Sequence, residues 1–163
     1  MIDTGAIFDS RRRYRYKLWR KWDEALPAVA YVMLNPSKAD AEFNDQTIRT
    51  CISLAKRFGF GSMEVVNLFA FCATYPEDLR AARNPVGKLN DEYLVETVQN
   101  AERVILAWGN HGAIRNRHED VLTLLQEHQH KLFCLGITKS AHPRHPLYTP
   151  ASTVLQLYSK CIN

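Results

Sequence analysis

Residues 28–37 read AVAYVMLNPS, and this stretch decides the fold class. Its first seven residues are nearly all apolar, which is typical of a short central strand covered on both faces. The run ends at Asn35, and Pro36 then fixes the direction of the backbone as it leaves the strand. A buried strand followed by a stiff polar loop is characteristic of a sheet that carries a ligand site at its edge.

Similar apolar runs recur along the chain and alternate with helical patterns. Strands are predicted over 63–69, 103–108 and 131–136, and helices over 46–58, 89–100, 113–128 and 150–160. Alternation of this kind predicts an α/β fold of three layers (α/β/α) with a mostly parallel central sheet of about four strands. An alternating strand around 13–18 is expected to pair with 28–34 as an N-terminal antiparallel hairpin. The length of 163 residues predicts one domain over 1–163.

The composition narrows the class of protein. Hydrophobic residues make up 46% and charged residues 23%, and no apolar run approaches a membrane span, so we expect no membrane partner. Residues 1–10 lack the pattern of a signal peptide, and four scattered cysteines form no CxxC pair. These features predict a cytoplasmic monomer without a metal site. The common dinucleotide and P-loop signatures are missing, so no cofactor is expected.

Basic and aromatic residues crowd into residues 11–22. Arginines and lysines there are interleaved with Tyr14, Tyr16, Trp19 and Trp22, a mixture that suits a phosphate backbone with bases stacked nearby. The alternative interpretation is a solvated strand face whose arginines pair with acids elsewhere. The candidate contacts to a nucleic-acid backbone are Arg11, Arg12, Arg13 and Arg15.

Polar residues follow each predicted parallel strand, at the edge where ligands bind in such sheets. Asn35 follows the first strand, and Asn67 lies in the apolar run of the next, where its amide must find hydrogen-bond partners. A lone Asn there is also a common turn or cap residue, and a lone surface His is usually solvated. The remaining candidates at this edge are Pro36, Ser37, Phe69, Trp108, Gly109, His142, Arg144 and His145.

Charged residues after Asn35 offer further candidates. Asp45, or Asn44 before it, suits the N-cap of the predicted helix, and Asp40 suits a turn, but a carboxylate in the pocket would favour catalysis. Arg49 has two interpretations, holding a phosphate or bracing Asp45. Either Asp therefore stays a candidate catalytic residue.

The motifs along the chain resemble a bacterial family, the domain of unknown function 1643 family. The resemblance covers nearly the whole chain but implies no activity. It is carried by the strings YVMLNPS (31–37), AD (39–40), DQTIR (45–49), NLFA (67–70), NPVG (84–87), ND (90–91), AWGNHG (107–112) and HPRHPLY (142–148).

A more distant resemblance implies a chemistry. The order of motifs is similar to that of the uracil-DNA glycosylase superfamily, with Asn35-Pro36-Ser37 at the water-handling motif, Asn67 at the base-reading Asn and Trp108-Gly109 before a helix. The string HPRHPL (142–147) matches the final loop with one extra residue, so either His142 or His145 takes the catalytic position. The glycine that usually opens the first motif is missing, and Met33-Leu34 lie there instead.

The resemblance and the residues together suggest a hypothesis. Cleavage of an N-glycosidic bond needs a positioned water and a hydrogen-bond donor to the departing base. Asn35 would hold the water, a histidine would donate to the base, Asn67 would read its edge, and Phe43 or Phe69 would stack on it. The expected partner is nucleic acid, DNA above all, or a nucleotide. The alternatives are a non-catalytic nucleic-acid-binding module and a hydrolase of free nucleosides or nucleotides.

Overall fold

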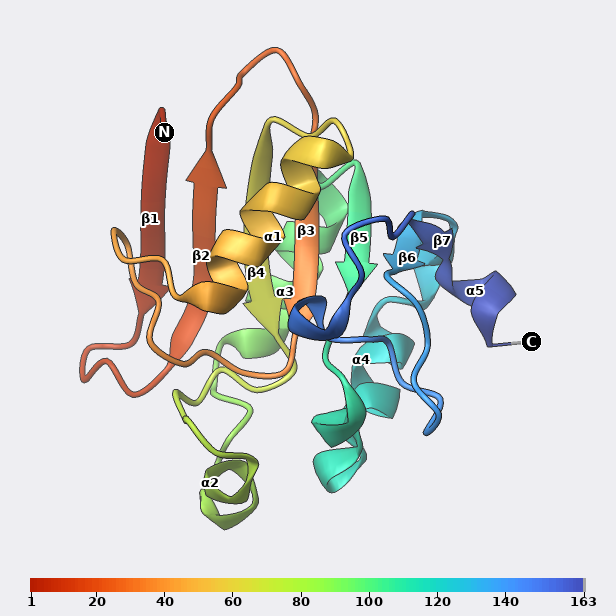
Figure 1. Cartoon of the computed structure of the whole chain (residues 1–163). Coiled ribbons are helices and arrows are strands. Elements are labelled where there is room, and N and C mark those ends of the chain that lie inside the picture. Colours follow the sequence, from red (N-terminus) through yellow and green to blue (C-terminus); the bar gives the residue numbers. More distant parts are fainter. Residues whose placement is uncertain (163) are drawn as a thin grey trace.

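A single mixed sheet of seven strands organises the chain in the computed structural model, which describes residues 1–162 (Figure 1). The order of strands across the sheet is β1-β2-β4-β3-β5-β6-β7. The bounds are β1 Asp3–Phe8, β2 Arg15–Lys21, β3 Ala28–Met33, β4 Ser62–Asn67, β5 Arg103–Leu106, β6 Leu132–Cys134 and β7 Gln156–Leu157. The α/β class predicted from the alternation is thus confirmed.

Strand β3 lies between β4 and β5 and is parallel to both. Its residues Val29 to Val32 are fully buried, as expected for a strand covered on both faces. Strand β6 continues the parallel pairing beyond β5. The predicted pairing of the segment near 13–18 with 28–34 was wrong, because β4 lies between β2 and β3. Both edges of the buried β3 pair with parallel strands, so β2 pairs instead with β1 and β4.

The N-terminal hairpin is formed by β1 and β2. Gly5 of β1 lies under the indole ring of Trp19, where a Cβ atom would come within 2.0 Å of the ring. Near the turn, Ile7 pairs with Lys17 and Phe8 with Arg15, so Tyr16 is an extra residue on β2. This β-bulge breaks the regular alternation of side chains along the strand.

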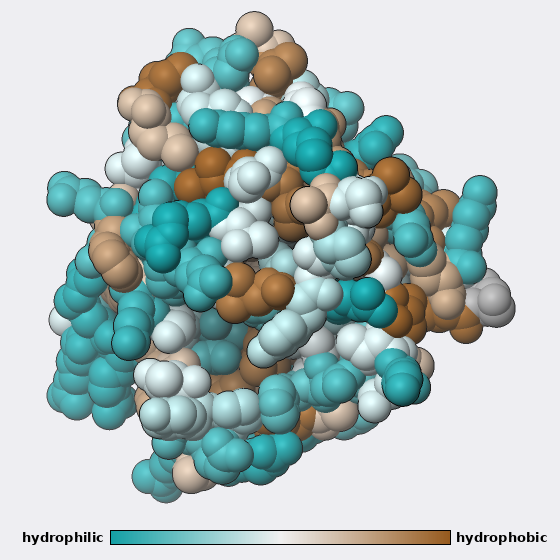
Figure 2. Space-filling model, in the orientation of Figure 1, coloured by the Kyte–Doolittle hydropathy of each residue, from teal (hydrophilic) through white to brown (hydrophobic). Residues whose placement is uncertain are grey.

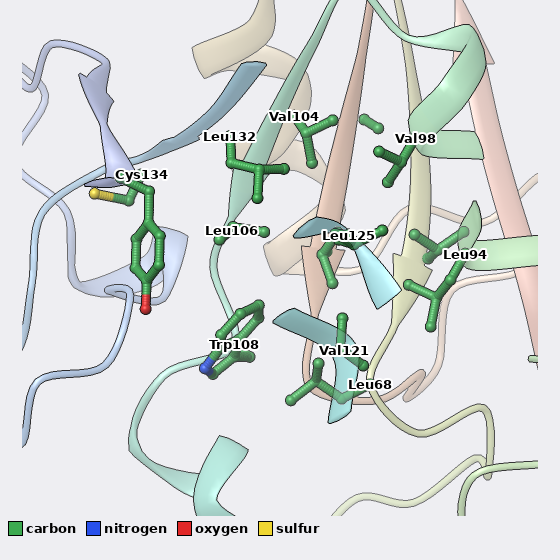
Figure 3. Close-up of a cluster of buried hydrophobic side chains, with 14 of the residues drawn as sticks. Leu68, Leu94, Val98, Val104, Leu106, Trp108, Val121, Leu125, Leu132 and Cys134 are labelled. Atoms are coloured by element: carbon green, nitrogen blue, oxygen red, sulfur yellow. The ribbon is translucent and has the colours of Figure 1, made fainter. Parts of the chain in front are cut away.

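Helices cover both faces of the sheet (Figure 1). Helix α1 (Gln46–Arg57) packs on one face, while α3 (Asn90–Asn100) and α4 (Arg117–Leu124) pack on the other. The core against α3 and α4 includes Leu68, Leu106 and Trp108 (Figure 3). Short elements complete the chain: α2 (Pro76–Ala81), α5 (Tyr158–Cys161), and the 3-10 helices η1 (Asn110–Asn116), η2 (Gln126–Lys131) and η3 (Pro146–Tyr148).

Two of the predicted helices differ from those found. The helix expected over 113–128 is divided, because Arg115 and Asn116 adopt a left-handed conformation before α4 begins. The Arg115 guanidinium donates to the carbonyls of Arg80 and Ala82, which ties this break to α2. The helix expected over 150–160 shrinks to α5, because residues 156–157 extend as β7 along β6.

The carboxyl ends of β3, β4 and β5 meet at one edge of the sheet, at the bottom of Figure 1, with α2 beneath them. In parallel sheets this edge is the usual place for a ligand. No helix within residues 1–162 has the length and apolar character needed to cross a membrane.

Candidate functional site

Two connected cavities lie at the carboxyl edge of the sheet. The inner pocket has a volume of about 160 Å³ and is lined by residues from β2, β3, β4, the start of α1 and the loop before η3. The outer cleft has a volume of about 660 Å³ and reaches the loops after β5 and β6. Five residues line both cavities, so the pocket opens into the cleft: Leu34, Asn35, Thr47, Thr74 and His145.

Asn67 lies at the end of β4 and lines the inner pocket. Its side chain is 1% exposed, and residues 1–162 supply no hydrogen-bond partner for either Oδ1 or Nδ2. We call such buried polar atoms unmatched. Behind it, the Asn90 amide donates to the backbone carbonyls of Asn67 and Leu68. The backbone is therefore fixed, while both polar atoms of the side chain have no partner in the described chain.

Asn35 lies where β3 gives way to its loop. Both of its amide hydrogens are used, since Nδ2 donates to the carbonyls of Pro36 at 2.8 Å and Ala73 at 2.7 Å. These bonds fix the orientation of the amide and leave Oδ1 as its remaining hydrogen-bonding atom, an acceptor. Asn35 lines both cavities, so this acceptor suits a bound water or a ligand N–H.

Arg15 also lines the inner pocket, apart from the exposed Arg11, Arg12 and Arg13. It is 3% exposed; Nη1 donates to the Ala39 carbonyl at 2.9 Å, and Nε is unmatched. Burial lowers the pKa of the guanidinium to about 10, opposed by nearby Cys72 and Asp45, so the group is still charged at neutral pH. This position does not fit the surface phosphate contact expected from the sequence.

The two candidate carboxylates are placed differently. Asp45 caps α1, with Oδ1 accepting from the Ile48 N–H at 2.9 Å, and it also lines the inner pocket. Asp40 turns its Oδ1 to the N–H groups of Glu42 and Phe43, and these bonds lower its pKa. Asp40 is thus a turn residue, whereas Asp45 brings a carboxylate to the site.

Of the two histidines, His145 lines both cavities. Its Nδ1 accepts a hydrogen bond from the Leu147 N–H at 3.2 Å, which places the ring proton on Nε2. Burial lowers the pKa of His145 against the opposing charge of Asp45, so the neutral form prevails at pH 7. His142 instead packs its ring edge-on against His118, 4.9 Å between centroids.

The outer cleft is lined by basic and aromatic groups. Lys139 and Arg144 lie on the loops after β6, and Tyr148 is 77% exposed at the rim. No Asp or Glu of the described chain contributes to its lining. Trp108 and Gly109 form its wall after β5; Gly109, at φ 72°, donates its N–H to the Pro143 carbonyl.

Other predicted site residues lie outside both cavities. Phe69 is fully buried in the core, and Phe43 is 54% exposed on the loop before α1. Arg49 donates to the Asn44 carbonyl, and Pro36 is buried behind Asn35, although Ser37 does line the inner pocket. Within residues 1–162 we find no group of three or more His, Cys, Asp or Glu side chains that could hold a metal ion.

Several residues at the site were missed by the sequence reasoning. Thr47 and Thr74 line both cavities, and Arg117 supports the strand end by donating from Nε to the Leu68 carbonyl at 2.8 Å. The string ND at 90–91 signals part of this support, because Asp91 in turn binds Arg117.

The fold and site together define an α/β protein with a polar, two-chambered cavity at the carboxyl edge of its parallel strands. The chain belongs to the family described as protein of unknown function (DUF1643), whose family model matches residues 15–147. This agrees with the first resemblance seen in the sequence. No curated protein and no solved structure matches the chain. The comparisons therefore support the resemblance to the DUF1643 family and give no support to the resemblance to the uracil-DNA glycosylase superfamily.

Proposed function

We propose that this protein is a nucleobase-processing enzyme of DNA glycosylase type, which cleaves the N-glycosidic bond of an altered or mismatched base. The observation that carries the proposal is the Asn67 amide, buried in the inner pocket with both polar atoms unmatched. An unsatisfied buried polar group costs about 1–3 kcal/mol. A ligand edge with a donor beside an acceptor, as every nucleobase has, removes that cost.

The dimensions of the two cavities support this assignment. A cavity of about 150 Å³ accepts a benzene ring, so the inner pocket at about 160 Å³ has room for one six-membered ring. The outer cleft, about four times larger at 660 Å³, has room for a sugar and its phosphates. A base in a duplex would have to be flipped out of the stack to reach the pocket.

The side chains suit hydrolysis of the bond between base and sugar. In the proposed reaction a water adds to C1′ of the sugar, and the electron pair of the C1′–N bond leaves with the base. Asn35 Oδ1 and Asp45 would hold the water, and Asp45 would take its proton. Nε2–H of neutral His145 would donate to a base oxygen as negative charge develops there.

The charge around the site supports a phosphate-bearing substrate. Lys139 and Arg144 line the outer cleft, and the exposed arginines 11–13 lie on the turn between β1 and β2. Figure 2 shows hydrophilic residues gathered at the lower left, where that turn lies in Figure 1. We therefore retain nucleic acid, DNA above all, as the proposed partner, a cytoplasmic location and the glycosylase-like three-layer arrangement as parts of this proposal.

One observation favours the rival, a non-catalytic nucleic-acid-binding module. Asp45 is the one carboxylate among the described residues lining the inner pocket, and its Oδ1 already caps α1. The cap bond occupies one carboxylate oxygen and so leaves less of the group free to hold a water. The rival predicts that the protein binds a base-containing strand without cutting it.

The experiment that tests the proposal looks for abasic sites. The protein is incubated with single-stranded and duplex oligonucleotides that carry uracil, deaminated purines or bulky modified pyrimidines, and abasic sites are revealed by alkaline cleavage. We expect product from at least one substrate, with turnover lowered far more than binding in Asn35→Ala, because the held water matters mainly in the transition state. Asn67→Ala should weaken binding of the base, because the hydrogen bonds to its edge are lost.

The other outcomes separate the alternatives. Retained binding with no abasic product across the panel would reject the enzyme in favour of the binding module. Product from free nucleosides alone would favour the small-molecule hydrolase.

A further inference from the structure

Arg15 is a buried cation whose hydrogen bonds are incomplete. The described chain supplies one side-chain bond, from Nη1 to the Ala39 carbonyl, and leaves Nε unmatched. Asp45 lies close enough to influence its pKa but forms no ion pair with it within residues 1–162. A guanidinium carries five N–H donors and no acceptor, so this side of the inner pocket accepts a ligand oxygen.

The β-bulge at Tyr16 explains how an arginine of this strand reaches the pocket. In an unbroken strand, alternate side chains share a face, and Arg15 would lie with Lys17. The extra residue lets the Tyr16 ring stack on Tyr93 of α3 while Arg15 lines the pocket beside Ile48 of α1. Bulges of this kind often re-aim a side chain beside a site.

Asn67 cannot by itself choose between bases. Its amide has a donor and an acceptor, and a rotation about its last bond exchanges them, so it can match either a keto or an amino edge. A guanidinium has no such freedom, because every orientation presents donors. Choice of ring in this pocket therefore depends on the fixed group, Arg15.

We propose that Arg15 is the specificity-determining residue of the inner pocket, donating from Nε to the carbonyl oxygen at C4 of a pyrimidine ring, the position where cytosine carries its amino group. A ring with an amino group at that position would set donor against donor and leave both unpaired. The pocket thus takes keto pyrimidines in preference to cytosine. This inference rests on the proposed function in that the inner pocket holds the base, but it does not require that the bond be cut.

The test measures binding of free rings to the full chain by NMR titration. The ligands are uracil, thymine, cytosine and, as a planar anion, benzoate. We expect uracil and thymine to bind about 10- to 100-fold more tightly than cytosine, the range for one charge-assisted hydrogen bond. Arg15→Lys should lower uracil affinity by a similar factor. Arg103→Lys is the control. Arg103 begins β5, at the end of the strand away from the carboxyl edge, so this variant should leave the affinity for uracil unchanged.

Arg15→Gln provides a second variant if the lysine variant does not fold. Its amide can present an acceptor, so cytosine should approach uracil in affinity. Equal binding of uracil and cytosine by the wild type, a keto preference that survives both substitutions, tighter binding of benzoate than of uracil, or no ring binding would each overturn the inference. Ring binding without abasic product would reject only the enzymatic proposal. Abasic product from the wild type, with the same choice of base in the Arg15 variants, would reject only this inference.

Discussion

Arg15 and Arg20 are buried arginines on the same strand, yet their surroundings differ. Arg20 is fully buried, and all three of its guanidinium nitrogens donate: Nε to Asn44 Oδ1, and the terminal nitrogens to backbone carbonyls. Arg15, which lines the inner pocket, makes one such side-chain bond and has an unmatched Nε. We infer that the partners of a buried polar group, rather than its burial, distinguish a structural brace from a candidate ligand-binding group.

The same contrast separates Asn90 from Asn67. Nδ2 of Asn90 donates to the carbonyls at the end of β4, while both polar atoms of Asn67, a residue that lines the inner pocket, are unmatched. Oδ1 is unmatched in both residues, so they differ only at Nδ2, which is bonded in Asn90 and unmatched in Asn67. Asn90 thus fixes the backbone of β4, and we propose that the neighbouring Asn67 side chain binds the ligand.

The largest expected effect concerns the two histidines of the same loop. His145→Ala should lower the rate of base release about 10²- to 10³-fold, the usual cost of removing one preorganised donor. His142→Ala, which alters the contact with His118, should leave the rate within a few-fold of wild type. Single-turnover assays on the best oligonucleotide measure both. Equal losses in the two variants would contradict the placement of His145 in the site.

The next effect concerns stability at the two arginines. Arg20→Met should lower the free energy of unfolding by about 3 kcal/mol or more, because several bonds from a charged donor, each about 1.5–3 kcal/mol, are removed. Arg15→Met should change it by less than about 1 kcal/mol, or raise it, because a poorly satisfied buried charge is replaced by an apolar chain. Urea unfolding, followed by circular dichroism, measures the free energy of unfolding of both variants. A larger loss at Arg15 than at Arg20 would reverse the comparison.

The pH dependence of base release gives a third test. Neutral His145 carries its proton on Nε2, so a second proton must bind to Nδ1. Protonation would therefore break the hydrogen bond that Nδ1 accepts from the Leu147 N–H. Burial lowers the pKa of His145 below its ordinary 6.5, so the neutral form persists to lower pH and disappears only as pH falls through the lowered pKa. We expect a flat rate near pH 7 and an acid limb below 6.5. The His145→Gln variant, measured in the same buffers, should lack that limb.

The smallest effect is expected at the turn between β1 and β2. Arg11, Arg12 and Arg13 are exposed there, and Arg12 lies over the ring of Phe8 at 3.9 Å. For each phosphate that the triple alanine variant no longer neutralises, the slope of log affinity on log salt should become shallower by about 0.9. Titrations of an oligonucleotide at several salt concentrations measure this. An unchanged slope would remove the turn from the nucleic-acid interface.

Much of the sheet was predictable because buried strands carry a strong local signal. The apolar run at 28–34 and the N-cap at Asp45 each depend on nearby residues, and both appear as expected. Strand partners depend on distant segments, so the order β2-β4-β3 could not be read from the run itself. Strand β1 (DTGAIF) was missed because Asp3 and Gly5 weaken its pattern.

The placement of side chains at the site was harder to predict. Alternation along residues 13–18 puts Arg15 on a solvent-facing side, and one extra residue at Tyr16 undoes that inference. His142 and His145 look equivalent in HPRHPLY, and only the folded loop turns one of them to the cavities. Such outcomes depend on three-dimensional packing, which local patterns do not encode.

We propose that unmatched buried atoms mark the ligand site where they belong to residues that line the inner pocket, as in Asn67 and Arg15. The other unmatched atoms of residues 1–162, Asn90 Oδ1, Thr97 Oγ1 and Trp108 Nε1, belong to residues outside that lining. The most direct measurement is a two-dimensional NMR spectrum of side-chain N–H groups, recorded with and without a bound oligonucleotide carrying the best substrate base. The account predicts that the Asn67 amide and Arg15 Nε–H signals shift, while those of Asn90 and Arg20 stay in place. Binding that shifts the Asn90 and Arg20 signals, or leaves Asn67 and Arg15 unmoved, would contradict it.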